Sequence, residues 1–155
     1  MKRRIFLKGT LAGSAVALAA GAGLLNPRQV LAAWPKSAFE AKSVSEAMKG
    51  ISGTDTAAGS TDIVIKAPDI AENGAVVPIK IDARKLSGVS SIAILAENNP
   101  TPLIANFKLG KSTQAFVSTR IKMGKTSNVI AVVTAGGTVT SARKEVKVTI
   151  GGCGG

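Results

Sequence analysis

The chain has 155 residues, a net charge of +11, one cysteine, and neither histidine nor tyrosine. This length fits one domain with an appendage. Without histidine, no Ser-His-Asp or Cys-His arrangement can form within the chain, and one cysteine does not make the usual zinc or copper site. Few aromatic residues are present to stack on single strands, so no nucleic-acid partner is expected. We predict no catalytic residue, metal or cofactor.

Residues 1–33 have the three-part pattern of a secretory signal. A basic start is followed by an apolar stretch over residues 9–25 and then by small residues, which place cleavage after Ala32 or Ala33. The apolar stretch is short and rich in glycine and alanine, so we predict a removable signal and no stable membrane anchoring. Removal leaves fifteen basic and nine acidic residues, a net charge of +6, which favours anionic partners or substrates.

The basic start is more specific than a general signal. It reads KRRIFLK, in which Arg3 and Arg4 form an arginine pair that precedes Phe6 and Leu7. This closely resembles the twin-arginine export signal. We therefore predict that the protein folds in the cytoplasm and is exported to the periplasm by the twin-arginine pathway, with a docked partner if it has one.

The domain is predicted to span residues 34–150 and to begin with one helix, Trp34–Ile51. Ser37 is a candidate N-cap because Glu40 follows three residues later. Gly50 and Gly53 are predicted to end the helix. An apolar stripe recurs at helical spacing and predicts a packed face: Phe39, Val44, Ala47, Met48 and Ile51.

The rest of the domain has the alternation and turn chemistry of short strands. About seven strands at short spacing predict a mainly β fold, an immunoglobulin-like antiparallel β-sandwich. Pro78 falls inside one run, so that strand is expected at an edge or a bulge. The predicted strands are Ile63–Lys66, Ala75–Asp82, Val89–Glu97, Leu103–Leu109, Ala115–Met123, Asn128–Thr134 and Thr138–Ile150.

The last five residues, 151–155, read GGCGG and hold the only thiol of the chain, Cys153. Glycine leaves the backbone path open, so we predict a flexible C-terminal arm that carries a thiol on a tether. No local cation or helix N-terminus activates this thiol. Such a thiol suits a carrier whose chemistry takes place in the active sites of other proteins. The glycines of the predicted arm are Gly151, Gly152, Gly154 and Gly155.

Two other kinds of protein fit parts of this pattern. An exported structural or adhesion β-sandwich would use Cys153 for an intermolecular disulfide. A ubiquitin-like sulfur carrier would hold sulfur as a thiocarboxylate on Gly155, but its chemistry needs ATP-dependent adenylation, and the strand-rich body lacks the expected central helix. The mass of the modified protein separates these alternatives.

The sequence resembles the SoxY family, the sulfur-carrying subunits of the bacterial thiosulfate-oxidising (Sox) system. The resemblance covers nearly the whole chain. Its stretches include AFEAKSVSEAMKGI, ENGAVVPIKIDA, ENNPTPLIANF and TRIKMGKTSNVIAVV, and its most specific motif is the terminal KVTIGGCGG.

The resemblance implies a non-catalytic carrier with Cys153 as the site of covalent attachment. It implies a heterodimer with SoxZ, a smaller sandwich protein without its own export signal. It also implies three enzyme partners: a haem-containing enzyme that joins thiosulfate to the cysteine, a hydrolase that releases sulfate, and, in some systems, a sulfane dehydrogenase.

Overall fold

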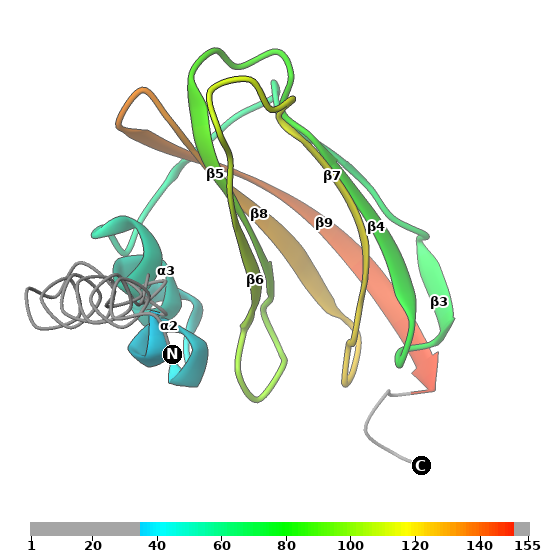
Figure 1. Cartoon of the computed structure of the whole chain (residues 1–155). Helices are drawn as coiled ribbons and strands as arrows, with labels where there is room; N and C mark the ends of the chain where they lie inside the picture. Colours follow the sequence, from blue (N-terminus) through cyan, green and yellow to red (C-terminus); the bar gives the residue numbers. More distant parts are fainter. Residues whose placement is uncertain (1–34, 151–155) are drawn as a thin grey trace, which may run out of the picture. The chain divides into compact units, whose positions relative to one another are not determined.

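The structure is a computed structural model that describes residues 35–150, and within this range it contains two short helices and nine strands (Figure 1). Neither helix is long and apolar enough to cross a membrane. The helices are α2 (Lys36–Glu40) and α3 (Val44–Ser52). The strands are β1 (Ala58–Gly59), β2 (Val64–Lys66), β3 (Ile70–Asn73), β4 (Val77–Asp82), β5 (Val89–Ala96), β6 (Leu103–Lys108), β7 (Phe116–Ile121), β8 (Ser127–Ala135) and β9 (Thr138–Ile150).

The strands form two sheets that pack face to face, which confirms the predicted β-sandwich. The larger sheet has the order β1-β9-β8-β5-β6, with β3 added beside β9. The smaller sheet has the order β2-β4-β7. Alternate residues of each strand point into the space between the sheets, because side chains on a strand alternate between its two faces. The largest fully buried side chains of this core include Ile79, Ile81, Ile92, Ile94, Val129, Val133 and Val146.

The helices cover the other face of the larger sheet. Ala47 and Met48 of α3 are buried against Leu95 of β5 and Ile130 of β8, in a second apolar cluster. The predicted apolar stripe of this segment therefore does face the protein. The molecule has three layers, helices, larger sheet and smaller sheet, and the smaller sheet keeps one face exposed.

The prediction of one continuous helix was wrong, because the chain leaves the helical path at residues 41–43. Ser43, not Ser37, is the N-cap that makes a side-chain hydrogen bond: its Oγ accepts from the Glu46 N–H at 3.2 Å. The Glu46 Oε2 accepts from the Lys42 N–H at 3.2 Å, in the manner of a capping box. The predicted cap at Ser37 does not form, since α2 has Pro35 at its N-cap and no side-chain cap.

The prediction that Gly50 ends the helix is wrong, because Gly50 lies within α3. A Cβ on Gly50 would come within 2.6 Å of the Ala38 Cβ, so glycine allows α2 and α3 to approach each other closely. Gly53 does end the helix. Its φ of 77° is the left-handed conformation that glycine adopts readily, and its N–H donates to the Lys49 carbonyl.

The seven predicted strands are present, and the structure adds β1 and β3. Both pair in parallel with β9, whereas the other strand pairs are antiparallel. Both are short, with two and four residues, and neither is among the predicted strands.

Pro78 lies in β4, which is the middle strand of the smaller sheet. However, β2 pairs only with the C-terminal half of β4, Lys80–Asp82, and stops before Pro78. On the side of β4 that faces β2, no strand lies next to Pro78. The backbone N–H that proline lacks therefore costs no hydrogen bond between strands on this side. The predicted edge position holds locally, although β4 as a whole is not an edge strand.

Candidate functional site

The residues predicted to carry function lie outside the described range. They are Arg3, Arg4, Gly151, Gly152, Cys153, Gly154 and Gly155. What the structure does describe is the point from which the C-terminal arm, residues 151–155, begins. This point is the end of β9 at Ile150 (Figure 1).

The end of β9 runs out of the core into solvent. Val146 is fully buried, Val148 is half-buried, and Ile150 is 64% exposed. These three residues form the apolar side of the strand. The strand thus remains regular while its surroundings change from core to water.

The last residues of β9 are held by β3 and not by the main sheet. The pairing of β9 with β8 ends at Val146, which lies opposite Ser127. From Lys147 onward β9 pairs with β3, in parallel, up to the pair of Asn73 with Ile150. Strand β3, which the sequence analysis missed, is therefore the element that holds the base of the arm.

Hydrogen bonds outside the strand ladder hold the same residues. The Val148 N–H donates to the Thr126 Oγ1 at 2.9 Å. The Thr149 Oγ1 donates to the Glu72 carbonyl at 2.9 Å. The Ile150 carbonyl accepts from the Gly74 N–H at 2.8 Å, so the last described residue is itself anchored.

Gly74 also joins the base of the arm to the smaller sheet. Its carbonyl accepts from the Met123 N–H at 2.7 Å, just beyond the end of β7. The chain then continues from Gly74 through Val76, which is 55% exposed, into β4. The N-terminal end of β4 and the C-terminal end of β7 therefore lie at the same end of the molecule as Ile150.

An ion pair between Asp82 and Arg84 lies on the exposed face of the smaller sheet, at the end far from the arm. The Arg84 Nε and Nη2 donate to the two carboxylate oxygens of Asp82 at 2.9 and 2.6 Å. These hydrogen bonds from Arg84 lower the pKa of Asp82 from 3.8 to about 2. The Arg84 guanidinium also lies 5.4 Å from the centroid of the Phe116 ring, within the range of a cation–π contact.

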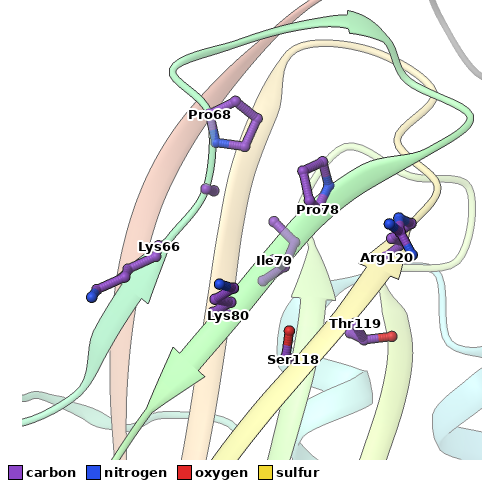
Figure 2. A pocket seen from close by; sticks show the side chains of 9 residues that line it. Lys66, Pro68, Pro78, Ile79, Lys80, Ser118, Thr119 and Arg120 are labelled. Carbon is purple, nitrogen blue, oxygen red and sulfur yellow. The ribbon is translucent and has the colours of Figure 1, made fainter.

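Nearer to the arm, the same face is hollowed into a groove of about 500 Å³ (Figure 2). Three of its lining residues are cations: Lys66 of β2, Lys80 of β4 and Arg120 of β7. Ser118 contributes a hydroxyl, and Pro68 and Pro78 border the groove at one end. None of its lining residues is acidic. The sequence analysis did not identify this groove.

Within residues 35–150 no group of three or more His, Cys, Asp or Glu side chains could hold a metal ion. The described features with functional chemistry are thus an anchored strand end that precedes a thiol-bearing segment, and a basic groove on the exposed sheet face.

These features define a β-sandwich protein whose firmly held last strand is followed in the sequence by the only cysteine of the chain. The model of the family described as the sulfur oxidation protein SoxY matches residues 48–153, a range that ends on Cys153. The chain belongs to the SoxY family.

A solved structure supports this membership. The chain is similar to the sulfur carrier protein SoxY from Chlorobium limicola f thiosulfatophilum, at 41% sequence identity and a TM-score of 0.61. The similarity covers 68% of this chain and 94% of that one. Among curated proteins no sequence matches. The predictions of the family and of the sandwich fold are confirmed.

Proposed function

We propose that this protein is a periplasmic carrier that holds thiosulfate-derived sulfur on Cys153 during sulfur oxidation, and that it catalyses no step itself. The observation that carries the proposal is the SoxY family match, which extends through the only cysteine of the chain. A similar solved protein is described as a sulfur carrier. The anchored end of β9 supports the proposal, because it presents the arm from a fixed point.

The proposed loading step joins the Cys153 thiol to the sulfane sulfur of thiosulfate. A new S–S bond forms, one proton leaves, and two electrons pass to a haem-containing partner enzyme. The product is a cysteine disulfide that ends in a sulfonate. A hydrolase then adds water across the bond between sulfur and sulfonate, which releases sulfate and a proton and leaves a persulfide on Cys153. In some systems a sulfane dehydrogenase oxidises this remaining sulfur.

Membership of the SoxY family implies a partner from the Sox system such as SoxZ. We propose a heterodimer with a SoxZ-like subunit. The described part of the chain exposes several large apolar side chains, and exposed apolar surface is typical of interfaces: Val64, Ile70, Val76, Phe116 and Ile150.

The carrier function is tested with two kinds of variant, one that removes the thiol of Cys153 and one that alters the glycines beside it. Cys153→Ser is expected to abolish sulfur loading, because no other thiol is present. Replacing Gly152 and Gly154 by Val is expected to be nearly as damaging, because β-branched side chains stiffen and widen the arm. The measurements are thiosulfate-dependent electron transfer in a reconstituted system and the intact mass of the protein.

The control is Gly59→Val, at a glycine of β1 where an added Cβ meets nothing within 4 Å. This variant should load sulfur as the unmodified protein does, and neither arm variant should change the melting temperature, since the arm follows the last strand. Full activity of Cys153→Ser would refute the carrier role. A mass that corresponds to a disulfide-linked dimer, with no sulfur adduct, would favour the structural alternative.

A further inference from the structure

We propose that the basic groove on the smaller sheet binds a sulfonate group. This groove is defined by Lys66, Lys80 and Arg120, with Ser118 directly opposite Lys80 (Figure 2). The ligand is the anionic end of a sulfur oxyanion, either free thiosulfate or the sulfonate carried on Cys153. The second source rests on the proposed carrier function.

The first argument is the register of the three strands. Lys66 lies directly opposite Lys80, and Lys80 lies directly opposite Ser118. Arg120 lies opposite Pro78, so it is the diagonal neighbour of Lys80. Directly opposed side chains have Cβ atoms about 5 Å apart and diagonal ones about 7–8 Å. Three cations therefore extend from one patch of the sheet, although the Lys66 amine points away from Lys80 (Figure 2).

The second argument is that no carboxylate of residues 35–150 forms an ion pair with these three cations, although the charge of Lys66 contributes to the lowered pKa of Asp82. Like charges directly opposite each other destabilise a sheet. Yet Lys66, Lys80 and Arg120 take part in none of the ion pairs found within residues 35–150. The acidic residue next along the exposed face of β4, Asp82, is held through both oxygens by Arg84. A bound anion would remove the repulsion that the fold leaves in place.

The third argument is that the groove suits this particular anion. An arginine fork can hold two oxygens of a tetrahedral oxyanion, and lysines add point charges. The rings of Pro68 and Pro78 offer an apolar border for the sulfur atom next to the sulfonate. The border at Pro68 is held in place, since the Lys144 Nζ donates to the Ala67 carbonyl at 2.8 Å and pairs with Asp69 at 3.0 Å.

The fourth argument is the position of the groove relative to the arm. Gly74 joins Ile150 to Met123 through two backbone hydrogen bonds. Arg120 precedes Met123 by three residues, which is about 10 Å along a strand. Residues 151–153 span about the same distance when extended. A sulfonate on Cys153 is thus within reach of the end of the groove that holds Arg120.

The experiment has two arms, each read out by amide chemical shifts in NMR spectra of the isotope-labelled protein. In the first arm, free thiosulfate is titrated into Cys153→Ser. In the second arm, the unmodified protein is treated with tetrathionate and then desalted. The Cys153 thiolate attacks a central sulfur of tetrathionate, which releases one thiosulfate and leaves the sulfonate-terminated disulfide. This loading needs no Sox enzyme, so a failure of the enzymatic carrier test does not affect it.

We expect saturable shifts at Lys66, Lys80, Ser118 and Arg120. Each cation that is removed should weaken binding by up to about fivefold, as for exposed ion pairs. The double variant Lys80→Gln/Arg120→Gln should therefore bind more weakly by about 2- to 25-fold. The matched control, Lys85→Gln/Lys108→Gln, removes two exposed lysines outside the groove and should bind as the unmodified protein does.

Shifts in the first arm identify free oxyanion as a ligand. Shifts in the second arm, reversed by a thiol reductant and absent from Lys80→Gln/Arg120→Gln, identify the tethered sulfonate. Equal weakening by the two double variants would overturn the proposal, because it would show attraction by overall charge alone. The absence of groove shifts in both arms would overturn it as well.

Discussion

The ion pair of Asp82 with Arg84 makes the free energy of unfolding depend on pH in the acidic range. Because the folded-state pKa of Asp82 is lowered to about 2 from 3.8, the ionised carboxylate is favoured by folding. The stabilisation is therefore fully present above about pH 4 and is lost as the pH falls through about 2. We expect Asp82→Asn to lack this part of the acid dependence, as measured by the denaturant midpoint between pH 2 and 6.

The matched control for this prediction is Asp55→Asn, which removes an exposed carboxylate that forms no ion pair within residues 35–150. Its acid dependence should follow that of the unmodified protein. If the two variants lose stability in parallel as the pH falls, the pair with Arg84 does not contribute to acid stability.

For individual residues, the sequence predicts a functional site only where the residues that form it are neighbours in the chain. Cys153 could be recognised because it is the only thiol and its neighbours in the chain are glycines. The basic groove could not be recognised, because Lys66, Lys80 and Arg120 come from three separate strands. Each looks like an ordinary exposed cation until the strand register brings them together.

Among the elements, β3 and the loop that contains Thr126 determine how firmly the arm is held at its base. Thr126→Val removes the hydroxyl that accepts from the Val148 N–H. A hydrogen bond of this kind contributes about 0.5–1.5 kcal/mol. We expect hydrogen exchange at the Val148 amide to become about two- to tenfold faster, with little change in the melting temperature.

Thr138→Val is the control, since Thr138 is an exposed residue at the opposite end of β9. It should leave exchange at Val148 unchanged. Exchange that stays equally slow in Thr126→Val would mean that β3 alone holds this end of the strand.

Elements with a strong repeating pattern could be predicted, and those defined by tertiary contacts could not. The alternation of β9 is visible over residues 145–150, and its strand is confirmed. Strands β1 and β3 have two and four residues, too few to show a period, and they exist because β9 offers them a parallel partner. The break between α2 and α3 was missed because Ser37-Glu40 and Ser43-Glu46 have the same capping spacing in the sequence, whereas the structure forms the side-chain cap only at Ser43.

For the molecule as a whole, we predict that the N-terminal arginine pair decides the compartment in which the protein functions. We predict that changing Arg3 and Arg4 to Lys leaves the protein in the cytoplasm, because the twin-arginine pathway requires the pair. Cell fractionation followed by immunoblotting measures this. The control changes Lys2 to Arg and should be exported normally. Normal periplasmic levels of the double lysine variant would contradict export by this pathway.

The anchoring of Ile150 also limits how far Cys153 can enter a narrow passage in another protein. Since the hydrogen bond from Gly74 and the pairing with Asn73 hold Ile150 on the body of the protein, only the chain beyond it can enter a narrow passage. Residues 151–153 span about 10 Å when extended. The thiol can reach the bottom of a passage of about this depth only if the mouth of that passage lies against the end of β9. There the mouth would meet the exposed side chain of Ile150, so its lining has to tolerate an apolar neighbour.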